Sequence, residues 1–441
     1  MIRTNYIEEL LTHRGETVTI AGWVDNVKEL PNLRFIILRD RSGVAQITIH
    51  KKNSAPDLIK QSEGLNLQDV ISVTGTVPEK QIAKIGPEVT PQTLSVLSRS
   101  QVPLPIDVTG GSDTELDKRL DWRVLDLRNP RNAAIFRIES KMMEGMEDWL
   151  RSHGYLHVAT PAILGGSSEG GSEVFKLDYY GSPAFLRQDP QLHRQLAIAG
   201  GLDKIYDLGP NWRAEMSHTP NHLSEHRACA VELGFITDEL DTERVEESMI
   251  AHAVGVVVEE CRAELELLVG STSNIPVKPS IPFPELRFPE IYDILKEYGK
   301  SIPFEGGLNR ESELVLARHV KEKTGHDFYF VNRFPFREKP FYVMRFDEEP
   351  TWARSVDMIY RGLEVSSGGQ REHRYEKLME QVKNKGMNEQ EIAWFTDNFK
   401  YGVPPHGGFA VGIERTVKQM LGLENVREVA LFPRTPERLR P

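Results

Sequence analysis

The sequence predicts an α+β protein in which a small amino-terminal β-barrel precedes a larger domain built on an antiparallel sheet flanked by helices. Short β-rich runs separated by turn residues fill residues 17–100, a long amphipathic helix follows, and strands then alternate irregularly with helices. No glycine-rich loop of the P-loop or dinucleotide type lies between a strand and a helix. An antiparallel sheet is therefore favoured over a doubly wound parallel one.

The composition is that of a globular chain with a large core. Of the 441 residues, 39% are hydrophobic and 27% are charged, which predicts two or three domains. No apolar run approaches the roughly 20 residues that span a bilayer, and the amino terminus lacks the apolar core of a secretion signal. The two cysteines, Cys229 and Cys261, fit a reducing compartment. We therefore expect a cytoplasmic protein that does not enter a membrane.

The net charge of −11 argues against indiscriminate binding of nucleic acids, which depends on neutralising phosphates. A protein with this net negative charge can still carry a local basic surface that binds a specific RNA.

The first domain is expected over residues 1–104, where short strands read as a barrel. A five-stranded barrel of this kind, an OB-fold, commonly binds single-stranded nucleic acid, with aromatic side chains stacked on the bases. Any single aromatic in these strands more often belongs to the core, because side chains alternate between the two faces. The runs are ETVTIAGWVDNV, RFIILRDRSG, VAQITIH, VISVTGTV and LSVLSR.

A hinge is expected over residues 105–131, where prolines and glycines give way to a charge-rich stretch. The second domain, residues 132–441, opens with a long helix from about Ala133, because apolar residues recur at three- and four-residue spacing. Gly154 is expected to end this helix, and Pro161 predicts an edge or a bulge in the next strand. Further strands are expected at KIYDLGP, VELGFI, DFYFVN, PFYVMRF, RGLEVSSG and GGFAVGI.

Two stretches combine arginines with the features needed to bind a nucleoside triphosphate. The residues Trp212–Glu215, followed by His222 and Glu232, resemble motif 2 of class II aminoacyl-tRNA synthetases in the form of the aspartyl and asparaginyl branch. The run Gly407–Arg415 resembles motif 3 of that family, and the helix and strand ending at Pro161 resemble motif 1, which forms the dimer interface. One glycine-rich arginine signature would be weak evidence, whereas three motifs in the right order are strong.

The resemblance implies that the chain binds ATP. Arg213 would contact the α-phosphate and the substrate carboxylate through its planar guanidinium group. Glu215 would bind the adenine amino group, and His222 would reach the γ-phosphate. The motif 3 glycines, Gly412 among them, would let ATP approach the backbone, with Arg415 beneath the triphosphate. Catalysis by charge neutralisation would then fall to Arg213 and Arg415.

The resemblance also implies a magnesium site. Asp357 and Glu364, in VDMIYRGLEVSSG, match the carboxylate pair that holds Mg²⁺ on the ATP phosphates, which makes Glu364 part of the ATP site. Carboxylate and phosphate oxygens suit this ion. Spacing alone would favour two solvated carboxylates, and the position in the motif reverses that preference.

Three segments resemble the places where the family selects its amino acid. Glu169 lies in the loop that closes over the substrate, and Gln191 and Arg194 match a glutamine and a lysine that contact the amino acid. Ser367 and Arg371 lie in SSGGQREHR, which is similar to the archaeal-type aspartyl form, where the arginine binds the aspartate side-chain carboxylate.

The sequence departs from the family around the amino acid. The aspartate that usually holds the α-ammonium group is Ala230, the usual serine is Asp189, and the usual lysine is Arg194, whose longer planar group changes the pocket. Asp189 either replaces the missing ammonium ligand or repels an acidic substrate. In motif 2, Asn221 stands for an arginine, and His226 lies where an aromatic would stack on adenine.

The barrel carries residues that the resemblance assigns to tRNA. Phe35 and Gln46 match residues that stack on and pair with the central anticodon uridine. Lys84 is retained, whereas Asp25 occupies a position that is tryptophan in tRNA-discriminating archaeal enzymes. We therefore expect tRNA for aspartate as a partner, and leave open whether tRNA for asparagine is charged as well.

The expected function is an aspartate–tRNA ligase that uses ATP and Mg²⁺, acts on an amino acid and tRNA, and forms a homodimer. The alternative is a paralogue that adenylates another amino acid or an analogue, either for small-molecule biosynthesis or as an inhibitor-resistant copy. A binding module without catalysis is disfavoured, because the residues assigned to ATP and the metal are all present.

Overall fold

The computed structural model describes residues 2–111, 114–166, 173–216, 219–270 and 275–440. The chain forms two compact units, Met1–Glu115 and Leu116–Pro441. The division falls inside the segment expected to be a hinge, residues 105–131. The later part of that segment forms two short helices of the second unit, α2 (Leu116–Asp121) and α3 (Arg123–Asp126).

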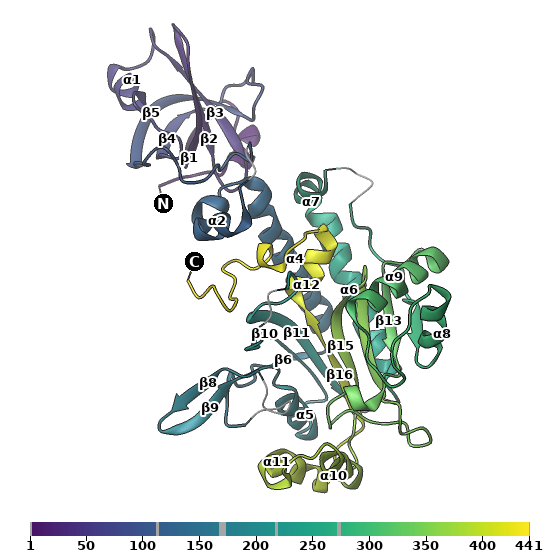
Figure 1. The fold of residues 1–441 in the computed structure, drawn as a ribbon. Helices are drawn as coiled ribbons and strands as arrows, with labels where there is room; N and C mark the ends of the chain where they lie inside the picture. Colours follow the sequence, from purple (N-terminus) through teal and green to yellow (C-terminus); the bar gives the residue numbers. More distant parts are fainter. Residues whose placement is uncertain (1, 112–113, 167–172, 217–218, 271–274, 441) are drawn as a thin grey trace. The chain divides into compact units, whose positions relative to one another are not determined.

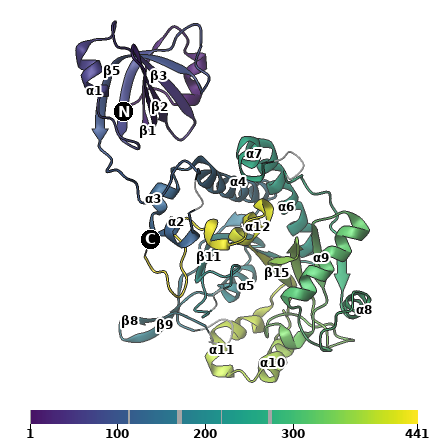
Figure 2. The same ribbon diagram turned by 45° about the horizontal axis from the view of Figure 1, so that its top comes forward.

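The first unit is a closed barrel whose strands follow the order β1-β2-β3-β5-β4 (Figures 1 and 2). Ile36 and Leu38 on β2 are fully buried in its core, whereas Phe35 and Ile37, which alternate with them, are only partly buried on the opposite face. The barrel expected from the alternating pattern is confirmed. Its elements are η1 (Ile7–Thr12), β1 (Thr17–Glu29), β2 (Leu33–Arg39), β3 (Val44–His50), α1 (Pro56–Ser62), β4 (Val70–Thr76) and β5 (Glu88–Ser98).

The second unit is built on an eight-stranded sheet with the order β12-β13-β14-β15-β16-β11-β10-β6 (Figure 1). Its central strands pair antiparallel, as expected, but the outer pairs β12–β13 and β10–β6 are parallel, so the sheet is mixed. Parallel pairs need long crossovers, and helices lie within both connections. The strands are β6 (Leu156–His157), β10 (Lys204–Trp212), β11 (Glu225–Gly234), β12 (Glu285–Arg287), β13 (Phe328–Asn332), β14 (Ser355–Tyr360), β15 (Leu363–Arg371) and β16 (His406–Gly412).

The main core lies between one face of this sheet and four helices. Side chains such as Met142 and Met249 pack there against Cys229 and Val231 of β11, all with under 1% exposure. The helices are α4 (Pro130–Ser152), α6 (Leu240–Glu260), α7 (Arg262–Val269) and α12 (Ile413–Leu421).

Helix α4 begins three residues before the expected Ala133, because the Asn129 side chain caps it and Pro130 occupies its first turn. No helix within the described residues is long and apolar enough to cross a membrane.

One expected strand is divided in two, with its first part at the sheet edge that Pro161 predicted, and another expected strand does not form. The run around Pro161 breaks into β6 and β7 (Ile163–Leu164), because proline cannot donate to a ladder. Strand β7 joins β9 (Ser182–Leu186) and β8 (Lys176–Tyr179) in a separate sheet. The run PFYVMRF makes only isolated bridges, since its apolar side chains fill a second core against α5 (Gln191–Ala199), α10 (Tyr375–Asn384), α11 (Glu389–Thr396) and η4 (Asp397–Tyr401).

Candidate active site

A cavity of about 320 Å³ opens on the face of the sheet that the core helices leave uncovered. On β11, His226 and Ala228 line it, whereas Cys229 points to the opposite face and the core. The strict alternation of strand side chains therefore separates the cavity from the core. Its predicted lining residues are Asp189, Gln191, Arg213, Glu215, His222, Glu364, Ser367, Arg371, Gly412 and Arg415.

Motifs 2 and 3 meet at one end of this cavity. Arg213 donates from Nη1 to Glu215 Oε1 at 3.3 Å, and His222 Nε2 lies 3.8 Å from the other oxygen of Glu215. Arg415, at the start of α12, donates to the Glu364 carbonyl oxygen at 3.3 Å. Two guanidinium groups thus face one cavity, as the binding of a triphosphate requires.

A neutral histidine lies in the same wall. Burial lowers the pKa of His226 to about 4, and the charges of Arg213 and Arg415 act in the same direction. It pairs across the sheet with Asn211, whose buried amide oxygen accepts no hydrogen bond from the described residues. An uncharged ring and an open acceptor suit a flat, hydrogen-bonding group such as a base.

The two predicted metal ligands lie on neighbouring strands, Asp357 on β14 and Glu364 on β15. Asp357 accepts from Lys339 Nζ at 2.8 Å and from Ser367 Oγ at 2.6 Å. Desolvation and then the charge of Asp357 raise the pKa of Glu364. A divalent cation would relieve this repulsion, so the pair fits Mg²⁺ shared with phosphates. No group of three or more potential ligands gathers within the described residues.

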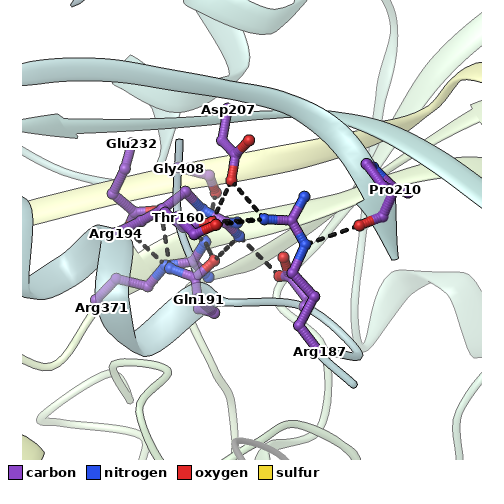
Figure 3. A network of polar contacts seen from close by, with 10 residues as sticks. Thr160, Arg187, Gln191, Arg194, Asp207, Pro210, Glu232, Arg371 and Gly408 are labelled. Carbon is purple, nitrogen blue, oxygen red and sulfur yellow. Dashed lines mark hydrogen bonds and ion pairs between the residues drawn. The ribbon is translucent and has the colours of Figure 1, made fainter. Parts of the chain in front are cut away.

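The other end of the cavity holds a buried polar network (Figure 3). Arg371, only 4% exposed, donates from Nε to Glu232 Oε1 at 3.0 Å and from Nη2 to Gln191 Oε1 at 3.2 Å. It also donates to the carbonyl oxygen of Gly408 at 3.0 Å. Gly408 has to lack a side chain, because a Cβ would lie 2.4 Å from Glu232 Oε2. Arg371 therefore lines this end of the cavity with its orientation fixed.

Arg194 supplies a second buried cation next to Arg371. Its Nη2 donates to Asp189 Oδ2 at 2.7 Å and to Gln191 Oε1 at 2.8 Å, and Gln191 in turn donates to Glu232 at 2.8 Å. Burial alone would raise the pKa of Asp189, but the charges of Arg194, Arg371 and Arg213 outweigh it and lower the pKa. Asp189 is therefore ionised at neutral pH.

A further ion pair, which the sequence did not reveal, lies beside Ala230. Asp207 on β10 pairs with Ala230 across the sheet, and its carboxylate lies 3.1 Å from Arg187 Nη1 (Figure 3). Thr160 also donates to Asp207. Arg187 in turn fits only because Gly209 leaves room, since a Cβ there would lie 2.5 Å from Arg187 Nη2.

Not every predicted residue lines the cavity. Arg194 and Asp357 are not among the lining residues, although each forms a hydrogen bond with one of them, Arg194 with Asp189 and Asp357 with Ser367. Glu169 falls outside the described residues. Conversely, the cavity includes Lys339, which sequence reasoning missed because its surroundings read as a strand.

A separate hollow lies on the barrel, and Phe35, Gln46 and Lys84 all line it. Gln46 donates to Thr48 at 3.2 Å. Asp25 does not line the hollow and forms an ion pair with Arg39 at 3.0 Å. The three predicted tRNA residues are therefore brought together on one surface.

A family model described as tRNA synthetases class II (D, K and N) matches residues 115–436. The chain belongs to the class II tRNA synthetases. A second model, for an OB-fold nucleic acid binding domain, matches residues 18–97 of this synthetase. The family resemblance and the fold class predicted from the sequence are both confirmed.

The synthetase is similar over its whole length to curated relatives. It is 41% identical to the aspartate–tRNA(Asp) ligase of Pyrococcus furiosus and 37% identical to the aspartate–tRNA(Asp/Asn) ligase of Aeropyrum pernix, with 100% of each chain covered. Among solved structures, it is similar to the asparaginyl-tRNA synthetase from Pyrococcus horikoshii complexed with asparaginyl-adenylate, with a TM-score of 0.93, 30% identity and full coverage of both chains.

Proposed function

We propose that this synthetase is an ATP-dependent aspartate–tRNA ligase. The observation that carries the proposal is the oriented Arg371 guanidinium in the same cavity as Arg213 and Arg415. A substrate with two carboxylates can then place one on Arg371 and present the other to the ATP arginines. The names of the full-length relatives support aspartate, and they do not favour a paralogue with another substrate.

The reaction needs no covalent bond to the protein. A carboxylate oxygen of aspartate attacks the α-phosphorus of ATP and releases pyrophosphate, and the terminal ribose hydroxyl of tRNA then attacks the aspartyl carbonyl and releases AMP. Arg213 positions the carboxylate and the α-phosphate, and Arg415 neutralises the triphosphate. Mg²⁺, held by Asp357 and Glu364, would supply further charge neutralisation on the phosphates.

We include both tRNA for aspartate and tRNA for asparagine among the substrates. By the family resemblance, Asp25 stands where discriminating archaeal enzymes carry tryptophan, and it forms an ion pair with Arg39 outside the hollow that Phe35 lines. Relatives of both names are known, since one is an Asp ligase and another an Asp/Asn ligase. We also place the enzyme in the cytoplasm, since its two cysteines are free thiols that fit a reducing compartment.

We also propose a homodimer. Helix α4 and strand β6 correspond to the segment that resembles motif 1, and β6 is an edge strand of the large sheet. Its exposed Leu156, together with Ile163 on β7, supports an interface at this edge.

The test of the proposed activity is exchange between ATP and pyrophosphate with each standard amino acid, followed by charging of purified tRNAs. We expect exchange with L-aspartate alone, and charging of both tRNAs. Exchange only with another amino acid would replace aspartate as the substrate, and charging of one tRNA alone would remove the relaxed specificity.

Replacing Phe35 by alanine should weaken tRNA charging while sparing adenylate formation. A base stacked on an aromatic ring is worth about 1 to 3 kcal/mol, so we expect the KM for tRNA to rise by about 5- to 150-fold. Steady-state charging and pyrophosphate exchange measure the two steps separately. Tyr401→Ala, at an 86% exposed aromatic of the second unit, is the matched control. Unchanged charging by Phe35→Ala would show that the barrel hollow does not bind the anticodon.

A further inference from the structure

An α-ammonium group is bound most strongly by a carboxylate, and the search for one in this cavity rests on the function proposed above. The position that usually carries the carboxylate holds Ala230, which is 2% exposed and uncharged. The nearest carboxylate across the sheet, Asp207, is itself 5% exposed and already binds Arg187 and Thr160. Neither Ala230 nor Asp207 lines the cavity.

The buried carboxylate next to Arg371 is not available for this task either. Glu232 is fully buried, lies outside the cavity lining, and accepts hydrogen bonds from Arg371 and Gln191. It neutralises Arg371 in the network of Figure 3. Since neither Asp207 nor Glu232 lines the cavity, the candidates among the described residues are the carboxylates that do line it.

Most of the carboxylates that line the cavity among the described residues belong to its ATP end. Glu215 lies beside Arg213, Glu364 beside Arg415, and Glu414 accepts from the backbone N–H of Arg227. Glu338 precedes Lys339, which binds the metal-site carboxylate. The remaining one is Asp189.

Asp189 lines the cavity together with the two guanidinium groups that would bind the two carboxylates of a dicarboxylic amino acid. With the side-chain carboxylate on Arg371 and the α-carboxylate on Arg213, the α-carbon lies between these two guanidinium groups. Asp189 lines the same cavity, and the charges of both Arg371 and Arg213 act on it. With an ammonium group bound to Asp189, each charged group of the substrate would face a protein side chain of the opposite charge.

We propose that Asp189 binds the α-ammonium group of the substrate, and that Arg194 is a positioning residue that holds the Asp189 carboxylate at 2.7 Å. Position 189 then takes the role that the family resemblance gives to position 230, where this chain has Ala230. An ionised carboxylate has about four acceptor sites, so it can bind Arg194 and the substrate together.

Arginine at position 194 suits this arrangement better than lysine. A single Nη2 group contacts both Asp189 and Gln191, and the planar guanidinium fixes the direction of both bonds. Arg194 is 1% exposed, so its orientation is set by packing. Compared with the family pattern, arginine replaces lysine at position 194 and aspartate replaces serine at position 189. In this arrangement the two replacements belong together.

The test is Asp189→Ser in the full-length enzyme, assayed by pyrophosphate exchange. Loss of a charge-assisted hydrogen bond predicts that the KM for L-aspartate rises by about 10- to 100-fold, with the KM for ATP little changed. Inhibition by succinate, which keeps both carboxylates and lacks the ammonium group, should keep its constant within about twofold. Asp293→Ser, at an exposed carboxylate of α8 (Glu290–Glu297), is the matched control.

The second variant restores the carboxylate at the other position. Asp189→Ser combined with Ala230→Asp should regain most of the affinity for L-aspartate, and Asp189→Asn should behave like Asp189→Ser while preserving the shape of the side chain. Thermal unfolding establishes that each variant is folded.

The outcomes separate this proposal from the proposed function. Equal weakening of L-aspartate and succinate, unchanged L-aspartate affinity, or a folded double variant without recovery would overturn the role of Asp189 while leaving an aspartate-dependent enzyme. Absence of aspartate-dependent exchange in the unaltered enzyme would overturn both proposals. A selective loss that the double variant reverses would establish the role.

Discussion

Replacing Arg213 by alanine is expected to lower pyrophosphate exchange by about 10³-fold or more. This side chain is assigned to both the attacking carboxylate and the α-phosphate, and removal of even one well-placed donor to a transition state costs about 10²- to 10³-fold. Arg213 is half-exposed, so its ion pair with Glu215 contributes little to folding and the melting temperature should hardly change. Exchange kinetics at saturating aspartate and ATP measure the effect.

Two further variants sharpen this prediction. Arg213→Lys keeps the charge but lacks the planar fork, so it should recover only a small part of the lost rate. Arg244→Ala removes an exposed arginine of α6 that also forms an ion pair, with Asp241, and it should leave exchange unchanged. Near-normal exchange by Arg213→Ala would refute the role assigned to motif 2 in this chain.

The barrel and the helices of the second unit could be predicted because the sequence patterns that encode them are local. Alternation along residues 17–100 fixed the barrel strands, and the three- and four-residue spacing after Ala133 fixed α4. The parallel outer pairs of the sheet could not be predicted in this way. They depend on where the crossovers through α5, α8 and α9 (Arg310–Thr324) return the chain, and no short window of sequence encodes that.

The candidate site could likewise be predicted only in part. Residue types at motif positions predicted which side chains would gather in the cavity, and the structure brings together Arg213, Arg371 and Arg415, which lie far apart in the sequence. The partners of these residues were not predictable. The bond from Arg371 to Glu232 requires β11, β16 and β15 to be adjacent and in register, which is a tertiary property.

Irregular backbone hid other members of the site. Lys339 precedes Pro340 and the continuous apolar run Phe341–Met344, which reads as a strand, yet the chain there forms only isolated bridges. Its ammonium group binds Asp357, so the sequence-based prediction of the charges around the proposed metal site lacked one cation. The pair between Arg187 and Asp207 was hidden for a similar reason, since it depends on the space that Gly209 leaves.

Replacing Arg371 by alanine is expected to damage the use of aspartate far more than the binding of ATP. The substitution removes the proposed partner of the side-chain carboxylate, and truncating one side of a buried charged pair costs about 2 to 5 kcal/mol, or about 30- to 5,000-fold in kcat/KM for aspartate. It also leaves Glu232 buried without its cation, so the melting temperature should fall. Exchange kinetics and ATP titration calorimetry measure the two substrates separately.

A second change separates binding from folding. Glu232→Gln in the Arg371→Ala background removes the uncompensated charge, so it should restore much of the stability while aspartate activation stays low. The amide can still accept a hydrogen bond from Gln191, which keeps that side of the network connected. If the double variant regained aspartate activation together with stability, Arg371 would be a structural residue and the carboxylate would bind elsewhere. Equal losses for ATP and aspartate in the single variant would point to the same conclusion.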